Sequence, residues 1–421
     1  MWISSTEQKK WSEGGRFAAE AGSELVITGE RGKPLFGWGC CISEICAKAI
    51  FSLSEEQQKE IFDQLFGAEG CGFNYCRLSI GANDFAESWY SYNETEGDYG
   101  MEQFSIDRDR KYILPAIKEA QKRSPELSFF ASPWSPPTWM KFPKAYNYGR
   151  LVDTEENLKA YALYFRRFVE EYTKEGVKID AVCPQNEFFS DQKFPSCVYS
   201  AKELERFMGY LVDEMKDLTQ VYYGTCNGPG PFNDDGLHSE YLGYLMQNPK
   251  LRESVKGAAF QWCGKLSIMQ ALEDYPELDF IQSECQCGDG NNTWAHAMYT
   301  LHLMHHYFYF GARANVYWNM ALAGDGLSTW GWRQNSLVSV KDGEYTFNPE
   351  FYLLKHFGHF VRKGAVMLST KGEMSSNATV FRNPDGSVMA VLSNPFETEK
   401  TVTLEGKNYV LEPRSFNTIV L

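Results

Sequence analysis

The sequence predicts an α/β protein: a (β/α)8 TIM barrel with a small β-sandwich side domain built from both termini. Eight short apolar runs alternate with helical stretches between residues 36 and 318, which is the pattern of a closed parallel barrel. The chain has 421 residues, enough for a barrel of about 250 residues plus a smaller domain. β-like segments separated by turn signals precede and follow the alternation.

The expected elements follow one another in regular order. Strands are expected at 36–42, 73–80, 127–132, 179–183, 221–226, 257–262, 278–281 and 314–318. Helices are expected between them at 54–65, 110–123, 155–174, 201–218, 238–247, 268–275 and 294–310. Ser54 is a suitable N-cap for the first helix, and the third carries its aromatic residues on one face. A doubly wound open sheet is the alternative, but the chain lacks a Gly-x-Gly-x-x-Gly turn that opens a helix.

The two ends of the chain predict one side domain. Four strand-like runs follow the barrel at 378–382, 387–392, 400–404 and 417–421. Segments 16–19 and 24–28 also read as strands, and strands before the barrel need a partner to cover their edges. We therefore expect N-terminal strands of the side domain in residues 1–30, the catalytic barrel in 31–362, and the C-terminal part of the side domain in 363–421.

Charge and composition narrow the class of partner. The net charge is -14 at pH 7, which argues against nucleic acid and anionic membranes, because both require clustered Lys and Arg. No window approaches 18 consecutive apolar residues, so we expect no integral membrane segment. Aromatic residues make up 15% of the chain, and flat rings suit the apolar faces of sugars. A small neutral carbohydrate or glycoside is the expected substrate.

The cysteines and the first residues predict a cytoplasmic protein. Eleven cysteines is an odd number, and several lie in apolar runs, as expected of reduced, buried thiols. Residues 1–10 show no charged segment followed by an apolar run, so we expect no secretory signal. Cys285 and Cys287 lack a second Cys/His pair at zinc-site spacing. We therefore predict no metal site.

Two glutamates carry the candidate chemistry. Glu187 follows the expected fourth strand and Glu284 the seventh, and active sites of such barrels lie at the carboxyl ends of the strands. A pair of carboxyl groups that face each other across a glycosidic bond can hydrolyse it. Asn186 can hold the 2-hydroxyl of the sugar beside Glu187. Arg77, at the end of the second strand, would keep Glu284 ionised. A solvated surface position is the alternative for each acid, and a rim ion pair for Arg77.

Three longer motifs resemble a known family. The segments 184–187 (Pro-Gln-Asn-Glu), 131–140 and 77–85 are similar to those of glycoside hydrolase family 30, the glucosylceramidase-like family. Similarity continues through 89–92, 104–107, 318–322 and 355–360, so that it spans about residues 36–364. The resemblance implies a retaining β-glycosidase without a cofactor, with a barrel and a β side domain built from both termini.

The resemblance also implies roles for individual residues. Glu187 would be the acid/base and Glu284 the nucleophile. Trp134, Asn186 and Trp318 would line the subsite of the non-reducing sugar, and Glu44 would bind its outer hydroxyls. Taken alone, the two tryptophans would more often be core aromatics than sugar platforms, but their positions at strand ends shift that balance.

The chain departs from the family pattern at the end of the sixth strand. Glucosylceramidases have His-Trp-Tyr there, whereas this chain has Gln261-Trp262-Cys263. The tyrosine that would support the nucleophile is therefore missing, and Gln261 could hold a sugar hydroxyl in place of the histidine. The Gly- and Trp-rich segment 324–332 could form the wall of the aglycone side or pack on the barrel rim.

We therefore expect a retaining exo-acting β-glycosidase that removes a terminal β-linked neutral sugar of the glucose, xylose, fucose or galactose type from a small glycoside. An endo-acting β-glycanase such as a β-1,6-glucanase is the alternative within the class. A non-catalytic carbohydrate-binding barrel is the alternative outside it. A serine hydrolase is disfavoured, because the Gly-x-Ser-x-Gly elbow is absent from the sequence.

Overall fold

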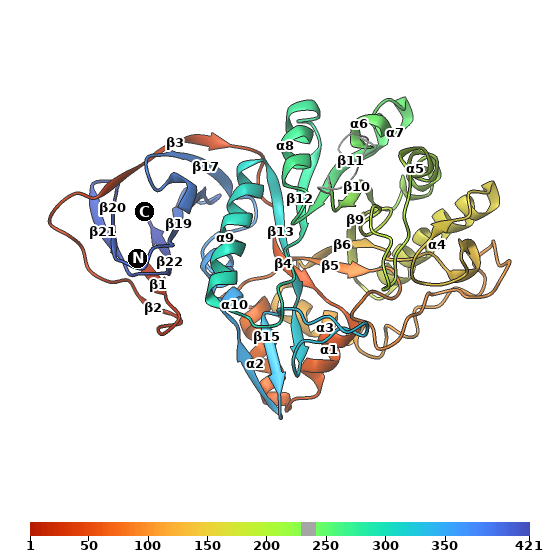
Figure 1. Ribbon diagram of the computed structural model, residues 1–421, viewed down its shortest axis with the longest axis horizontal. Coiled ribbons are helices and arrows are strands. Elements are labelled where there is room, and N and C mark those ends of the chain that lie inside the picture. The colour runs from red at the N-terminus through yellow and green to blue at the C-terminus, as the bar shows by residue number, and fades with distance from the viewer. Residues whose placement is uncertain (229–240) are drawn as a thin grey trace.

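A closed barrel of eight parallel strands forms the centre of the molecule (Figure 1). The computed structural model describes residues 1–228 and 241–421. All eight expected strands are present, and neighbours in the chain are neighbours in the barrel. They are β4 (Gly37–Cys41), β5 (Tyr75–Ser79), β6 (Ser128–Ser132), β9 (Lys178–Val182), β10 (Gln220–Cys226), β11 (Val255–Gln261), β12 (Asp279–Glu284) and β13 (Ala312–Asn319).

Helices cover the outside of the barrel. They are α1 (Glu44–Phe51), α2 (Glu55–Phe66), α3 (Ile113–Arg123), α4 (Glu155–Lys174), α5 (Ala201–Met215), α6 (Tyr241–Leu245), α7 (Pro249–Ser254), α8 (Lys265–Asp274), α9 (Trp294–Tyr309) and α10 (Pro349–Gly358). Ser54 caps α2 through a reciprocal capping box with Gln57. The bounds expected for α4 agree with the structure. The start of the helix expected at 238–247 lies outside the described residues.

Small strands extend the loops and are not apparent in the sequence. β7 (Lys141–Phe142) pairs with β8 (Arg150–Leu151). β14 (Ala321–Ala323), β15 (Val338–Lys341) and β16 (Glu344–Phe347) form a three-stranded sheet after the last barrel strand. This sheet and α10 lead the chain back towards the side domain.

The interior of the barrel is a packed core. Side chains from seven of its eight strands meet there as one buried cluster, which Phe36 flanks: Tyr75, Phe130, Ala181, Cys183, Tyr222, Ala259, Ile281, Ala314 and Val316. Large aromatic residues and small residues are combined in this set, as close packing of a narrow barrel requires. The cluster supports the strand ends where the functional side chains begin.

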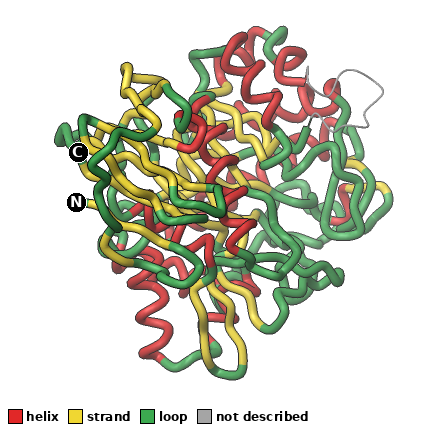
Figure 2. Tube along the Cα trace, turned by 60° about the vertical axis from the view of Figure 1, so that its left-hand side comes forward, coloured by secondary structure: helices red, strands yellow, loops and turns green. Residues whose placement is uncertain are grey.

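The side domain joins both ends of the chain, as expected. Its nine strands run in the order β2-β1-β22-β19-β18-β17-β3-β20-β21, and Figure 2 shows both termini beside them. β3 pairs with β17 on one edge and with β20 on the other, so one strand connects the two layers. The strands are β1 (Trp2–Ser5), β2 (Ser12–Glu13), β3 (Ser23–Arg31), β17 (Val366–Lys371), β18 (Ala378–Arg382), β19 (Val388–Asn394), β20 (Lys400–Leu404), β21 (Lys407–Leu411) and β22 (Ser415–Val420).

One expected strand of the side domain is wrong. Segment 16–19 forms only an isolated bridge from Phe17 to Tyr409. The ring of Phe17 packs against Trp2 and Tyr409, with centroids 5.8 and 5.2 Å apart. The apolar character of the segment therefore serves side-chain packing, whereas the first residues of the chain provide the strand β1.

Buried His356 fixes the barrel to the side domain. Its Nδ1 lies 2.8 Å from Thr418 Oγ1 and its Nε2 2.8 Å from Ser5 Oγ. The Thr418 hydroxyl donates to the carbonyl of His356, so it accepts from Nδ1–H, and Ser5 donates to Nε2. Burial lowers the pKa of His356 to about 3. The side chain is therefore neutral in the folded protein.

We expect His356 to make the protein acid-sensitive. Its pKa is about 3 when folded and about 6.5 when unfolded, so its stabilising effect is complete above pH 6.5 and decreases as the pH falls towards 3. Between pH 7.5 and 4.5 the loss amounts to about 3 kcal/mol. Urea unfolding of the wild type and of His356→Asn at both pH values measures it. The wild type should lose more unfolding free energy than the variant, and equal losses would contradict this role.

Candidate active site

A cavity of about 370 Å³ opens at the carboxyl ends of the barrel strands. Both candidate glutamates line it, and so do most of the predicted sugar-binding residues. The residues from different strand ends that meet there include Asp84, Trp134, Asn186, Glu187, Glu284 and Trp318. The fold thus brings together side chains that are far apart in the sequence. They meet at the carboxyl ends of the strands, where active sites of such barrels lie.

Glu187 stands in a loop that is held by the two neighbouring strands. After β9, the amide of Asn186 donates to Pro133 O (2.7 Å) and that of Glu187 to Thr225 O (3.1 Å). Glu187 adopts a left-handed backbone conformation with φ of +50°. Such a conformation in a residue other than glycine costs on the order of 1–3 kcal/mol and is common at functional sites. The loop therefore directs the carboxyl group into the cavity.

Glu284 is the last residue of β12 and is 5% exposed. Its Oε2 accepts from Arg77 Nη1 (2.6 Å) and from Gln261 Nε2 (3.1 Å). Its Oε1 faces the Cys287 thiol, with an Sγ–Oε1 distance of 3.7 Å. The carboxyl group is thus fixed on both sides and presented to the cavity.

Arg77 connects the two halves of the site. It is fully buried in β5, and besides Glu284 it donates through Nη2 to Asn186 Oδ1 (2.7 Å) and Ser132 Oγ (2.9 Å). Its guanidinium lies 4.5 Å from the ring centroid of Trp134, within the range of a cation–π interaction. The ion pair predicted between Arg77 and Glu284 is present, in the barrel interior and not at its rim.

Trp134 and Trp318 form one aromatic surface. Their rings stack with centroids 5.3 Å apart, and both residues line the cavity. Each is only 2% exposed, so a sugar would meet ring edges and a limited part of a face. The tryptophans therefore belong both to the core and to the cavity.

Gln261 lies behind the cavity wall. Its Nε2 donates to Asn186 Oδ1 (2.8 Å) and to Glu284 Oε2 (3.1 Å), and the side chain is fully buried. It is not among the residues that line the cavity. Gln261 thus holds two residues of the site in place. Its amide nitrogen, which was expected to bind a sugar hydroxyl, is hydrogen-bonded to the oxygens of these two side chains instead.

Glu44 is not brought to the cavity. Its Oε1 and Oε2 accept from Arg108 at 3.0 and 2.9 Å, and Oε2 also accepts from the amide of Glu87 (2.8 Å). Glu44 begins α1, a helix that the sequence pattern did not predict. Both carboxylate oxygens are used in fixing the segment between β5 and α3, which gives Glu44 a structural position.

Asp84 is the acidic residue that the sequence interpretation missed. It lines the cavity, and its Oδ1 is buried without a hydrogen-bond partner in the described part of the chain. Burial raises its pKa to about 7, and the negative charge of Glu187 adds to the increase. Asp84 follows β5 by five residues in the same motif as Arg77, so the strand-end argument could have found it.

Tryptophans of the expected rim loop form the outer wall. Trp330 and Trp332 line the cavity and pack edge to face at 5.0 Å. Phe194, from the loop after β9, packs on Trp330 at 5.1 Å. The segment 324–332 therefore contributes to the cavity wall and does not merely pack on the barrel rim.

Electrostatics distinguish the two glutamates. Burial raises the pKa of Glu187, and a hydrogen bond from Ser190 and the charge of Arg77 oppose the increase. Burial and, to a smaller degree, the charges of Glu187 and Asp84 raise the pKa of Glu284, whereas the Arg77 guanidinium lowers it and favours the ionised form. Only Glu284 of these three acids forms an ion pair with Arg77 in the described residues.

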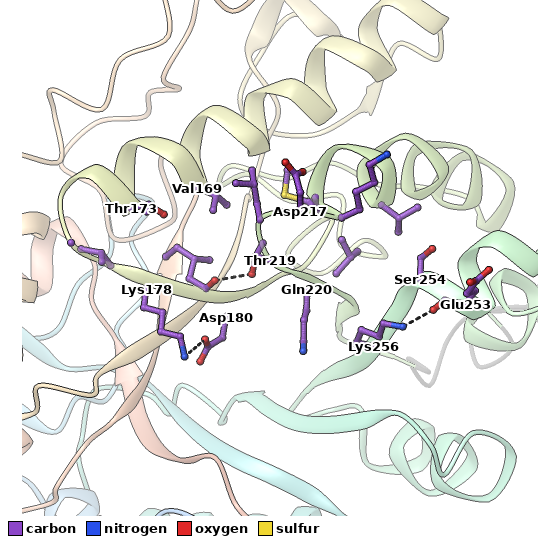
Figure 3. A pocket seen from close by; sticks show the side chains of 18 residues that line it. Val169, Thr173, Lys178, Asp180, Asp217, Thr219, Gln220, Glu253, Ser254 and Lys256 are labelled. Atoms are coloured by element: carbon purple, nitrogen blue, oxygen red, sulfur yellow. Dashed lines mark hydrogen bonds and ion pairs between the residues drawn. The ribbon is translucent and has the colours of Figure 1, made fainter.

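A larger hollow, of about 940 Å³, lies at the opposite end of the barrel (Figure 3). It is lined by the first residues of β9, β10 and β11 and by the ends of α4 and α5. Its charged groups interact locally: Lys178 pairs with Asp180 (2.8 Å), and Lys256 donates to Glu253 O (2.7 Å). The amino ends of barrel strands serve stability and not catalysis, so this hollow is not the candidate active site.

Family comparison agrees with this geometry. Residues 35–211 match the glycosyl hydrolase family 30 TIM-barrel domain, and residues 364–419 match the family 30 beta sandwich domain. The chain belongs to glycosyl hydrolase family 30. It is therefore a glycosidase, and the fold expected from the sequence is confirmed.

Relatives of this family 30 hydrolase differ in their named activities. It is 26% identical to putative glucosylceramidase 3 of Caenorhabditis elegans, over 94% of this chain and 81% of the relative. It is 24% identical to the lysosomal acid glucosylceramidase of Mus musculus (92% and 80%). It is 25% identical to an endo-1,6-beta-D-glucanase of Trichoderma harzianum (86% and 78%).

Solved structures share the whole fold. SrfJ from Salmonella typhimurium matches with a TM-score of 0.87 at 23% identity, covering 100% of this chain and 98% of that one. The endo-beta1,6-glucanase BT3312 matches with a TM-score of 0.88 at 22% identity, with the same coverage. At this level of identity, the likeness concerns the arrangement of barrel and side domain.

Among the residues that the structure describes, no group of three or more His, Cys, Asp or Glu side chains is arranged to bind a metal ion. All 11 cysteines are free thiols. Within the same described residues, none of the helices has the length and apolar character needed to cross a membrane.

Proposed function

We propose that this family 30 hydrolase is a retaining β-glycosidase that acts by double displacement. The observation that carries the proposal is the unequal environment of two carboxyl groups lining one cavity. Glu284 is paired with Arg77 at 2.6 Å, whereas Glu187 lines the cavity, is partly exposed and forms no ion pair with the described residues. A charged carboxylate that attacks the anomeric carbon and a protonated one that serves the leaving oxygen are the two groups this reaction needs.

The charge distribution follows from coupling between the acids. Three carboxyl groups around one guanidinium cannot all be ionised, so their protons are lost in steps that belong to the three groups together. Arg77 touches Glu284, so the first negative charge resides there. The next charge must form against repulsion and burial, which keeps the proton on Glu187. Glu284 is then the nucleophile and Glu187 the general acid, which becomes the base for the attacking water.

We propose a β-linked glucose as the sugar that is cleaved. The curated relatives are named as glucosylceramidases and endo-1,6-beta-glucanases, and both names denote glucosyl substrates. The cavity volume of about 370 Å³ is at the small end of the range for ligand pockets. This size favours a terminal sugar and a short aglycone, and hence exo action on a small glycoside.

An endo-1,6-β-glucanase is the second candidate. It is supported by the TM-score of 0.88 with the structure of such an enzyme. Incubation with a linear β-1,6-linked glucan and chromatography of the early products separate the two modes. Exo action should release a monosaccharide alone from the first minutes, and a series of oligosaccharides would establish endo action instead.

Asp84 is the proposed ligand for the outer hydroxyls of the sugar, in place of Glu44. Asp84 lines the cavity, and its Oδ1 is buried without a hydrogen-bond partner among the described residues; a buried acceptor without a partner is suited to a hydroxyl donor. In Asp84→Asn, kcat/KM for an aryl β-glucoside should fall about 10- to 100-fold.

Glu44→Gln is the matched control, because Glu44 is also a buried acid but pairs with Arg108. A panel of aryl β-glycosides that differ at C4 and C6 then identifies the hydroxyl. The loss in Asp84→Asn should shrink for the substrate that lacks it. A uniform loss across the panel would argue against direct contact with these hydroxyls.

A further inference from the structure

The two oxygens of Glu284 have different partners. Oε2 accepts hydrogen bonds from Arg77 and Gln261. Among the described residues, the hydrogen-bond donor to Oε1 is the thiol of Cys287, at an Sγ–Oε1 distance of 3.7 Å. We propose that Cys287 is a positioning residue that orients Oε1 of the nucleophile. This inference rests on the proposed function, in which Glu284 attacks the sugar.

The polarity of this contact is determined by chemistry. An ionised carboxylate can only accept, so the thiol must donate. Burial and the nearby charges of Glu284 and Asp84 raise the pKa of Cys287 well above its ordinary value. The thiol therefore keeps its proton at neutral pH, and this proton is not transferred in the reaction.

The loop after β12 fixes the thiol in position. The backbone amide of Asn335 donates to the carbonyl of Cys287 (2.7 Å), and its side-chain Oδ1 accepts from the amide of Gly290 (2.9 Å). Gly288 has φ of +69°, and a Cβ there would lie 2.4 Å from Asn335 Cγ, which excludes a larger residue. Asn335 thus organises the loop that carries Cys287, and the thiol is held against Oε1 by a packed scaffold.

The other cavity thiol does not take this role. Cys263 stands where the resemblance leads us to expect a supporting tyrosine, but its Sγ contacts Asn227 O at 2.9 Å. The supporting tyrosine is missing at the end of β11. Cys287, three residues beyond Glu284 in the chain, supports the nucleophile in its place.

The thiol leaves one oxygen available for attack. Arg77 and Gln261 occupy Oε2, and a thiol is a weak donor, so Oε1 keeps most of its negative charge. As Oε1 bonds to the anomeric carbon, the glycosidic bond breaks and its oxygen takes the proton of Glu187. In the second step water attacks the anomeric carbon, its proton passes to the Glu187 carboxylate, and the bond between this carbon and Oε1 breaks, which releases the sugar and frees Glu284. Cys287 aligns Oε1 for the first step.

The test compares Cys287→Ala, Cys287→Ser and wild type on an activated aryl β-glucoside over a range of pH. The acid limb of kcat/KM reports ionisation of the nucleophile in the free enzyme. Loss of a donor to the charged form raises the pKa of that form. The acid limb of Cys287→Ala should therefore move up by about half to one pH unit, with kcat/KM about 3- to 10-fold lower, and serine should restore part of both.

Cys263→Ala is the matched control, because that thiol also lines the cavity but contacts no carboxylate among the described residues. Its acid limb should stay in place. An unshifted limb in Cys287→Ala, or an equal shift in Cys263→Ala, would overturn the inference. Glu284→Ala separates the two levels: if it is inactive while Cys287→Ala behaves as wild type, only the positioning role fails. If Glu284→Ala is active, the proposed function itself fails.

Discussion

Replacing Glu284 by alanine should lower kcat/KM for aryl β-glucosides by on the order of 10⁴-fold or more, because the group that forms the covalent intermediate is lost. Glu284→Gln should be almost as inactive, since an amide cannot carry the charge. Steady-state kinetics of both variants measure the effect. The alanine variant also creates space in the cavity, so added azide should attack the anomeric carbon and restore turnover, giving the α-glycosyl azide.

Glu44→Gln is the control for this loss. Glu44 is a buried glutamate that pairs with an arginine, as Glu284 does, but it lies outside the cavity. Because Glu284→Ala leaves the Arg77 charge buried without its partner, it should also be destabilised by about 3–5 kcal/mol. Thermal unfolding of each variant separates this effect from catalysis. Substantial activity in a folded Glu284→Gln would contradict the role of nucleophile.

Replacing Glu187 by alanine should produce a loss that depends on the leaving group. Alkyl β-glucosides need a proton on the departing oxygen, so their kcat/KM should fall about 10²- to 10⁴-fold. Dinitrophenyl glucosides leave without a proton and should keep most of their kcat/KM, while kcat falls because no base activates water. Kinetics on a series of leaving groups give the slope against leaving-group pKa, which should become steep in the variant.

The pH profile provides the second readout for Glu187. Because burial raises its pKa, the acid form persists to a higher pH than for an exposed glutamate, and activity should be lost as the pH rises through that raised pKa. The basic limb of kcat/KM should disappear in Glu187→Gln. A loss of equal size for all leaving groups, with the basic limb retained, would exclude Glu187 as the general acid.

Local signals predicted the barrel, because the strands are short apolar runs and the stretches between them read as helices. The reciprocal cap of Ser54 and the full length of α4 are examples. Features that depend on distant partners were missed or wrong. β1 pairs with β22, at the other end of the chain, as well as with β2, and Phe17 forms only an isolated bridge with Tyr409.

Features of the site that depend on distant partners could not be predicted from the sequence either. Position after a strand predicted that Glu187, Glu284, Arg77, Asn186 and the two tryptophans meet. It did not predict that Gln261 donates a hydrogen bond to the Glu284 carboxylate, or that Glu44 forms an ion pair with Arg108. These outcomes depend on side-chain directions within irregular loops. The role of Cys287 also depends on an irregular loop, which Asn335 organises and which places the thiol beside Oε1 of Glu284.

The configuration of the first-formed sugar tests the central claim most directly. Proton NMR of an aryl β-glucoside reaction, recorded before mutarotation, distinguishes the two anomers of the product. Double displacement through Glu284 inverts the anomeric carbon twice, so the β-anomer should appear first and the α-anomer only later. Initial release of the α-anomer would mean a single displacement by water and would contradict the assignment of Glu284 as nucleophile.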